Sequence, residues 1–342
     1  MSFDITRQSL LRTVFYFLLL FVLFSGREYL FMPVAAPPDG DGTIMPLQAL
    51  LLRFLSAFPW TVPVLTFLLV FVDSFFLTRI IARNLIFLER TYMPSLIYLM
   101  VSLGYYAAAG SVITLAVAFL VMYAAESMIL SYKRRAQFGY FFHAGVALGA
   151  APLLYAPAAV FGILLPVGLG LFRKQWRDGA VALTGFLLPL FFTSYVYWGM
   201  GEPFSTVVRQ IAAALTSEFP AKDFFHGQDP LWGYVLSGIF LTVLVVSLAT
   251  FVRRRKKMRN RSFKAYLLFV WMLVAVATLF ALPGRSLDML PLAAVPLAMI
   301  VPTYFNRRTG LWPNLLYALM MFALLAYNLL PFIRFYQENG LR

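Results

Sequence analysis

Three acidic residues near the N-terminus are of the type that a transferase or a cation site requires. Glu28 stands beside Arg27, directly after an apolar run, and Asp39 and Asp41 follow in the sequence PPDGDG. A carboxylate can act as a general base, and carboxylate oxygens bind divalent cations. Glu28 is therefore a candidate base, with Asp39 and Asp41 as assisting groups or cation ligands. The alternative for Glu28 is a local ion pair with Arg27 or an anchor at the membrane interface.

Asp73 and Glu126 differ from these residues because each falls inside a long apolar segment. A charged side chain within a membrane is costly unless it faces a polar interior, has a partner or is neutralised. Both are candidate functional residues that either pair with a neighbouring helix or mark a proton path. Asp73 lies toward one end of its segment, where reaching the interface or simple pairing is the alternative.

The composition predicts an integral membrane protein. The chain has 342 residues, of which 61% are hydrophobic and 12% charged, whereas soluble domains are near half apolar and a quarter charged. Its apolar runs have the length of membrane-spanning helices rather than of barrel strands. With no cysteine and two histidines, disulfides, thiolate sites and a histidine-rich metal centre are excluded. No nucleotide-binding glycine loop is present, so the chain is not an ATP-driven pump by itself.

We predict one all-α polytopic domain over residues 1–342, with about eleven transmembrane helices. The predicted spans are 10–25, 61–80, 94–109, 111–130, 138–155, 156–172, 179–200, 231–252, 265–282, 289–304 and 311–333. This register puts most of the 28 Lys and Arg residues on one side, which the positive-inside rule assigns to the cytoplasm. It predicts a bacterial inner-membrane protein with a cytoplasmic N-terminus, a periplasmic C-terminus and a basic cytoplasmic loop at 253–264. Because the net charge of +14 gathers at a membrane surface, we expect membrane lipids as partners and no nucleic acid.

Two outer loops, at about 26–60 and 201–230, each contain an amphipathic run. In residues 46–58 the apolar side chains recur at helical spacing, with Arg53 on the other face. In residues 204–215 the same pattern places Arg209 opposite the apolar face. Such helices are typical of a membrane interface. They either cap the bundle or border a groove that admits a lipid-linked substrate.

Residues 283–299 read PGRSLDMLPLAAVPLAM, in which Arg285 stands at an outer turn before an apolar helix. This segment resembles the late helix of the GT-C glycosyltransferases, multi-pass enzymes that use polyprenyl-phosphate sugars. The order of first span, acidic outer loop, interfacial helix and second span is similar too. The resemblance implies a GT-C-like fold, with Glu28 as the catalytic base and Arg285 as the contact to the lipid phosphate. Over most of its length the chain also resembles an uncharacterised family of multi-pass inner-membrane proteins from Bacteroidetes.

Three functions follow from these observations. The first is a glycosyltransferase that takes a sugar from undecaprenyl phosphate at the periplasmic face, with Glu28 as base and Arg285, Arg209 and Arg27 as phosphate contacts. Arginine suits that role because its guanidinium can bind two phosphate oxygens at once. The second is a non-catalytic scaffold or partner subunit of an envelope, secretion or polysaccharide-assembly complex. The third is a transporter, which requires Asp73 and Glu126 to face a shared cavity.

Overall fold

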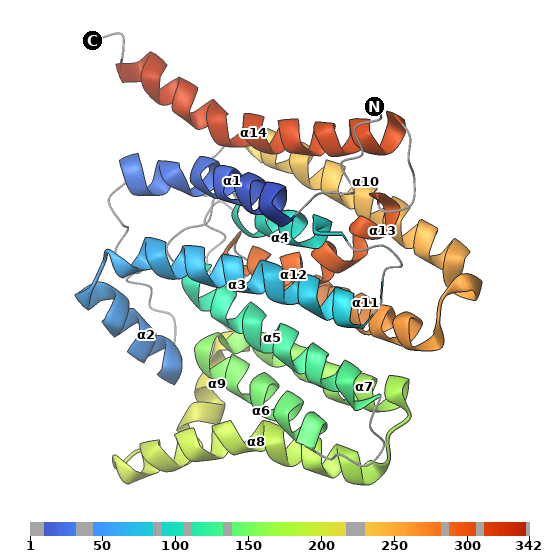
Figure 1. Ribbon diagram of the computed structural model, residues 1–342. Coiled ribbons are helices and arrows are strands. Elements are labelled where there is room, and N and C mark those ends of the chain that lie inside the picture. Colours follow the sequence, from blue (N-terminus) through green and yellow to red (C-terminus); the bar gives the residue numbers. More distant parts are fainter. Residues whose placement is uncertain are drawn as a thin grey trace.

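The structure is a computed structural model in which every described secondary-structure element is a helix (Figure 1), which confirms the all-α class. It describes residues 10–31, 44–84, 86, 91–104, 111–132, 139–216, 230–281, 287–305 and 311–339. For residues 25–31, 111, 230–232, 254, 257, 287, 311 and 329–339 the description covers the backbone alone.

Five helices in the described part of the chain are long and apolar enough to cross a membrane. They are α3 (Thr61–Arg83), α5 (Ser111–Ser131), α8 (Trp176–Gly199), α10 (Pro230–Arg254) and α11 (Asn260–Ala281). Trp176 and Trp198, 79% and 59% exposed, lie near the two ends of α8. They are about 33 Å apart along the helix axis, close to the thickness of a bilayer's hydrocarbon core. Tryptophans at that separation are typical of the two membrane interfaces. The protein is thus built as a membrane protein.

The remaining helices are shorter, interrupted or incompletely described. They are α1 (Leu10–Phe31), α2 (Pro46–Ala57), α4 (Met93–Leu103), α6 (Gly139–Leu154), η1 (Ala156–Ile163), α7 (Leu164–Phe172), α9 (Thr206–Thr216), η2 (Arg255–Lys257), η3 (Leu287–Met289), α12 (Leu290–Ile300), α13 (Pro302–Phe305) and α14 (Leu311–Asn339). Each of the eleven predicted spans contains a helix, but two of them are broken in the middle. The sixth is divided into the 3₁₀-helix η1 and α7, and the tenth into α12 and α13. The structure therefore does not confirm eleven membrane crossings.

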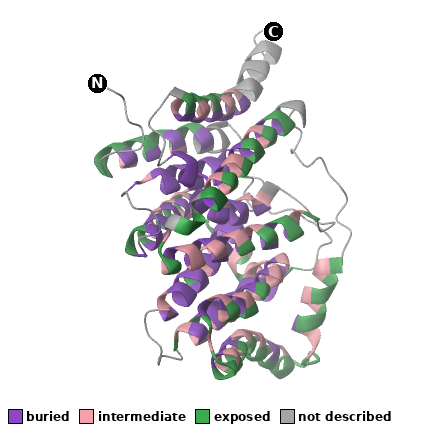
Figure 2. Ribbon diagram, turned by 90° about the vertical axis from the view of Figure 1, so that its right-hand side faces the viewer, coloured by how far each residue is buried: buried purple, intermediate pink, exposed green. Residues whose placement is uncertain are grey.

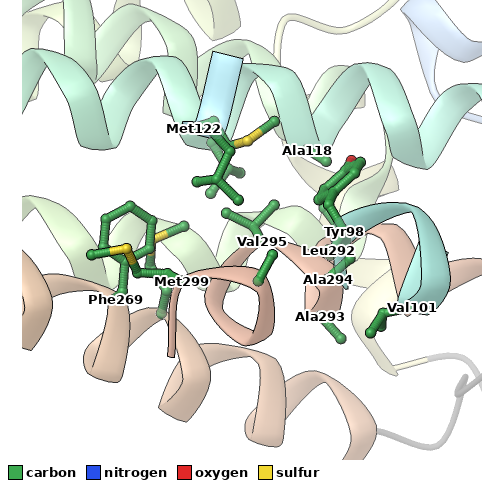
Figure 3. Close-up of a cluster of buried hydrophobic side chains, with 14 of the residues drawn as sticks. Tyr98, Val101, Ala118, Met122, Phe269, Leu292, Ala293, Ala294, Val295 and Met299 are labelled. Carbon is green, nitrogen blue, oxygen red and sulfur yellow. The ribbon is translucent and has the colours of Figure 1, made fainter. Parts of the chain in front are cut away.

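Two of the short helices, α4 and α12, pack against each other in the core. Every residue of α4 is buried, and so is nearly every residue of α12. Tyr98 of α4 lies in one cluster with Leu292 and Val295 of α12 (Figure 3). Helices α1, α3, α5 and α11 surround this pair, and Figure 2 shows the buried residues concentrated in the middle of the bundle. A helix that is apolar on all sides is suited to such a position. At eleven residues, α4 is about 16 Å long and too short to cross a bilayer.

Helices α6 and α8 pack backbone to backbone through glycines. A Cβ atom added at Gly149 would lie 2.1 Å from the carbonyl oxygen of Phe186, and one at Gly145 would lie 2.2 Å from that of Ala182. On α8, a Cβ atom at Gly185 would lie 2.5 Å from the carbonyl oxygen of Phe142. Small residues that permit this approach are a common basis of helix association in membranes. The contact fixes α8 on the bundle although most of its surface is exposed.

The two ends of the bundle differ in chemistry (Figure 1). Helices α3, α5 and α7 end, and α8 and α11 begin, at one end, which we name the basic end. It carries Arg83, Arg173, Lys174, Arg261 and Lys264. Helices α2 and α9 lie at the opposite end, which we name the α2/α9 end.

Candidate functional site

The predicted catalytic residues come from the end of the first span and the segment that follows it in the chain. Helix α1 continues through Arg27 and Glu28 to Phe31, so this pair lies in helical backbone rather than in a loop, and its side chains are outside the described part. Asp39, Asp41 and Arg285 lie outside the described residues altogether. Of the predicted catalytic and phosphate-binding residues, only Arg209 has a described side chain, and it is exposed on α9.

Helix α2 forms where the amphipathic pattern predicts it. Pro46 occupies its first turn, and the backbone N–H of Met45 donates a hydrogen bond of 3.3 Å to Gln48 Oε1. Leu55 packs in a small cluster with Val62 and Val112, at the starts of α3 and α5.

The rest of the apolar face of α2 is open. The side chains of Leu50, Phe54 and Phe58 are exposed, and the rings of the two phenylalanines lie 5.6 Å apart. With the exposed Arg53 beside them, these side chains make a surface that is both apolar and positively charged.

Helix α9 also carries apolar and basic groups together. Val207 is fully buried, whereas Val208, on the same predicted face, is exposed next to Arg209. The ring of Phe204, just before α9, lies 5.7 Å from that of Phe191 on α8. Gln210 Oε1 is buried and has no hydrogen-bond donor in the part of the chain that the structure describes, which is an unusual state for a polar atom.

One corner of the bundle holds both amphipathic helices. Helix α2 packs on α6, α9 packs on η1, and η1 follows α6 directly after Tyr155. Asp288, at η3, lies close enough to Tyr155 for an electrostatic interaction. Tyr155 and Gln210 were not predicted as site residues from the sequence. An uncharged polar residue in an apolar helix carries no sequence signal of its own.

Asp73 of α3 is fully buried in the bundle. Its Oδ2 accepts a hydrogen bond of 2.8 Å from the hydroxyl of Tyr98 on α4. Its Oδ1 is buried, and no described residue donates a hydrogen bond to it. Asp73 therefore does not reach the interface but is held in the core by one strong contact.

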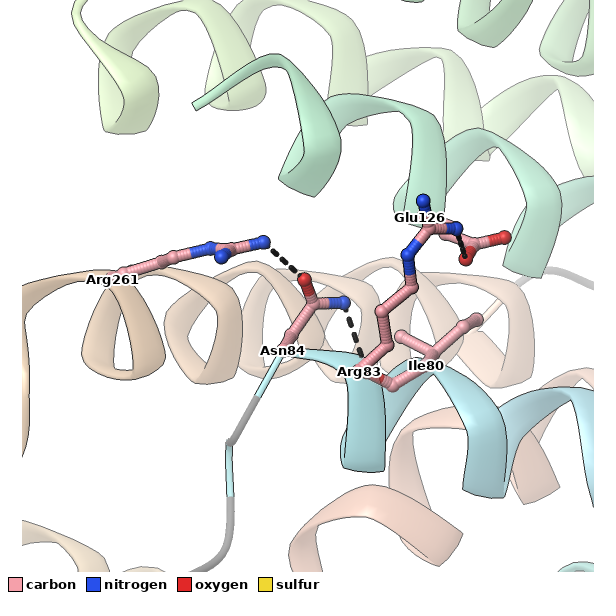
Figure 4. A network of polar contacts seen from close by, with 5 residues as sticks. All are labelled: Ile80, Arg83, Asn84, Glu126 and Arg261. Carbon is pink, nitrogen blue, oxygen red and sulfur yellow. Dashed lines mark hydrogen bonds and ion pairs between the residues drawn. The ribbon is translucent and has the colours of Figure 1, made fainter. Parts of the chain in front are cut away.

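Glu126 of α5 has a different partner. Its Oε1 accepts a hydrogen bond of 3.2 Å from Nη1 of Arg83, with side-chain exposures of 46% for Arg83 and 7% for Glu126. Asn84, which follows Arg83 in the chain, donates a hydrogen bond of 2.9 Å from Nδ2 to the carbonyl oxygen of Ile80. It also accepts a hydrogen bond from Nη2 of Arg261. Figure 4 shows these contacts joining the ends of α3, α5 and α11.

The two intramembrane acids serve separate contacts. Arg83 follows Asp73 by ten residues on α3, which is about 15 Å along the helix axis. Asp73 turns to α4, whereas Glu126 meets the end of α3. The transporter hypothesis needs the two carboxylates in one cavity, and this geometry gives it no support. Among the described residues, no three His, Asp or Glu side chains gather as a metal centre does.

Comparison with known protein families, curated proteins and solved structures found no match to this chain. The coarse class, an all-helical protein with five described helices that are long and apolar enough to span a membrane, rests on the fold itself. The likeness to GT-C glycosyltransferases and to the Bacteroidetes family stays a prediction from the residues quoted for it.

Proposed function

We propose that this protein is a GT-C-like glycosyltransferase that uses a sugar carried on undecaprenyl phosphate at the periplasmic face of the inner membrane. The observation that carries the proposal is the gathering of α2 and α9 at one corner of the bundle, on α6 and η1. Both helices present exposed apolar side chains beside an arginine, Arg53 on one and Arg209 on the other. A polyprenyl phosphate has the matching chemistry, an apolar chain joined to an anion.

The proposed reaction divides the work between a carboxylate base and arginines that bind phosphate. Glu28 takes the proton from the acceptor hydroxyl, whose oxygen then forms a bond to the anomeric carbon of the sugar. The bond from that carbon to the phosphate oxygen breaks, and undecaprenyl phosphate leaves with the electron pair. Arg285, with Arg209 and Arg27, holds the leaving phosphate through charge-assisted hydrogen bonds. Asp39 and Asp41 assist, or hold a divalent cation at the phosphate.

The competing function is a scaffold in an envelope complex, in which the same two helices cover the bundle without binding substrate. It requires the helix-packing faces but neither Glu28 nor Arg285. The two functions therefore differ in what single polar substitutions do.

The test uses the full chain in lipid nanodiscs with undecaprenyl phosphate that carries a radiolabelled hexose. Transfer is followed as label that leaves the lipid in the presence of an envelope extract as acceptor source. We expect Glu28→Gln to lower transfer by a factor of about 10² to 10⁴, the usual contribution of a general base, while undecaprenyl phosphate still binds. Arg285→Gln should weaken binding of undecaprenyl phosphate, measured by native mass spectrometry, about tenfold.

Glu202→Gln is the matched control, because Glu202 is an exposed carboxylate in the turn between α8 and α9. It should leave both transfer and binding within twofold of the original protein. Full transfer by the Glu28→Gln variant would remove the base assignment. A protein that neither binds undecaprenyl phosphate nor transfers the label would favour the scaffold.

A further inference from the structure

The basic end brings together cations from three separate helices or their ends. Arg83 at the end of α3 and Arg261 at the start of α11 lie close enough for their charges to repel each other. Lys264, one turn further along α11, and Arg173, just after α7, repel in the same way. Such an arrangement costs free energy unless an anion is placed among the cations.

Tyr132, which directly follows α5, lies close to two of these cations. The ammonium of Lys264 is 5.1 Å from its ring centroid, and Arg261 lies nearby. Beside it, Nζ of Lys174 donates a hydrogen bond of 3.0 Å to the carbonyl oxygen of Ser131. Contacts with Tyr132 and Ser131 thus position Lys264 and Lys174 at this end.

Few acids at this end balance the cations. Among acidic residues with described side chains, Glu126 and Asp178 lie here. Glu126 is paired with Arg83, and Asp178 accepts a hydrogen bond of 3.1 Å from the backbone N–H of Gln175 at the start of α8. Neither is bonded to Arg261, Lys264 or Arg173 by any described hydrogen bond or ion pair.

Arg261 retains hydrogen-bonding capacity. One of its terminal nitrogens donates to Asn84, while its Nε is buried and has no acceptor among the described residues. A buried donor without a partner is costly, and a guanidinium with free donors suits a phosphate. The arginine is therefore suited to bind an anion.

Arg173 adds a second, independent sign. It ends α7 in the left-handed conformation, with φ of 51°, where glycine would avoid the steric cost of a side chain. Its side chain is exposed beside Lys264. An arginine at a position that favours glycine indicates a use for its charge.

An apolar crevice of about 300 Å³ lies next to this end, between α7 and α8. Leu165, Leu169, Leu183 and Phe186 are among its lining residues. Leu169 precedes Arg173 by about one helical turn. A lipid with its headgroup phosphate at the basic end has room for part of an acyl chain there.

We propose that the basic end binds a phosphate group between Arg83 and Arg261, with Lys264 and Arg173 supplying further positive charge. The phosphate belongs either to an anionic lipid headgroup or to a free phosphate ion. This site lies at the opposite end from the proposed transferase site and does not depend on it.

The test compares full-length protein in nanodiscs of phosphatidylcholine alone, of phosphatidylcholine with phosphatidylglycerol, and of phosphatidylcholine with inorganic phosphate in the buffer. Bound lipids are counted by native mass spectrometry, and thermal unfolding is followed by tryptophan fluorescence. We expect phosphatidylglycerol to be retained about tenfold more tightly than phosphatidylcholine, and Arg261→Gln to remove most of that preference. Stabilisation by inorganic phosphate alone would assign the same site to a free ion.

Arg253→Gln is the matched control, because Arg253 is an exposed arginine of α10, and it should change retention less than twofold. Lys264→Gln guards against a folding defect in Arg261→Gln, since it removes charge but leaves the contact to Asn84. It should lower retention several-fold. If Arg253→Gln and Arg261→Gln lower lipid retention equally, the preference reflects the overall positive charge, and the site is overturned. The absence of any response to phosphatidylglycerol and to inorganic phosphate would also overturn it.

Discussion

At the scale of single residues, the contact between Asp73 and Tyr98 places a carboxyl group in the interior of the bundle. Both residues are fully buried, and one carboxyl oxygen has the tyrosine hydroxyl as its donor at 2.8 Å. In an apolar interior a polar group without its partner costs more than the hydrogen bond contributes. The hydroxyl of Tyr98 is therefore needed for as long as the carboxyl group is present.

We expect Tyr98→Phe to lower the free energy of unfolding by about 1–3 kcal/mol, because Asp73 then loses its described donor. Tyr123→Phe is the control, since Tyr123 lies on α5 with 37% of its surface exposed. Thermal unfolding of the purified variants, followed by tryptophan fluorescence, measures the difference. The double variant Asp73→Leu with Tyr98→Phe removes both groups and should be no less stable than Tyr98→Phe alone. If the double variant is clearly less stable than Tyr98→Phe, the lost hydrogen bond to Asp73 is not the cause of the destabilisation.

The sequence was informative about which residues are unusual, but not about their partners. Asp73 and Glu126 are conspicuous because they interrupt apolar segments. Their partners, Tyr98 and Arg83, are 25 and 43 residues away in the chain. Tyr98 reads as one more aromatic in an apolar helix, and Arg83 as an ordinary interfacial cation. Only the packing of α3 against α4 and α5 gives these side chains their roles.

At the scale of elements, the glycines between α6 and α8 let the backbones of the two helices come into direct contact. Gly149→Val would place side-chain carbon where the backbone of Phe186 now lies, since even a Cβ atom would be 2.1 Å from its carbonyl oxygen. We expect a loss of about 1–3 kcal/mol in the free energy of unfolding, the usual cost of overpacking. The midpoint of thermal unfolding is the measurement.

Gly238→Val makes the same chemical change in α10, where nothing lies within 4 Å of an added Cβ atom. It should leave the unfolding midpoint nearly unchanged. If Gly149→Val and Gly238→Val lower the unfolding midpoint equally, Gly149 does not stabilise the protein through the close approach of α6 and α8.

Helix positions were largely predictable, but membrane crossings were not. Amphipathic periodicity predicts α2, and long continuous apolar runs predict α3, α5 and α8. The same hydropathy predicts spans at α4 and α12, which are short and buried in the core. A protein interior and a lipid bilayer are both apolar, so hydropathy does not separate a helix that faces lipid from one that faces other helices.

At the scale of the whole molecule, the two ends define an axis for the proposed activities. The proposed transferase site occupies the α2/α9 end, and the proposed phosphate site occupies the basic end. The positive-inside rule predicts that the basic end faces the cytoplasm. A substrate on undecaprenyl phosphate would then approach from the periplasm, while the phosphate site would face the lipids of the inner leaflet.

The absence of cysteine from the chain permits a direct test of this orientation. Single cysteines are introduced at exposed positions, Ser56→Cys and Glu202→Cys at the α2/α9 end and Lys256→Cys at the basic end. Intact bacterial cells with a permeabilised outer membrane are treated with a maleimide that cannot cross the inner membrane. We expect labelling at positions 56 and 202 at once, and at position 256 only after the inner membrane is broken. Labelling in the reverse order would place α2 and α9 in the cytoplasm. The proposed reaction uses sugars on undecaprenyl phosphate from the periplasmic face, so that result would also contradict the transferase proposal.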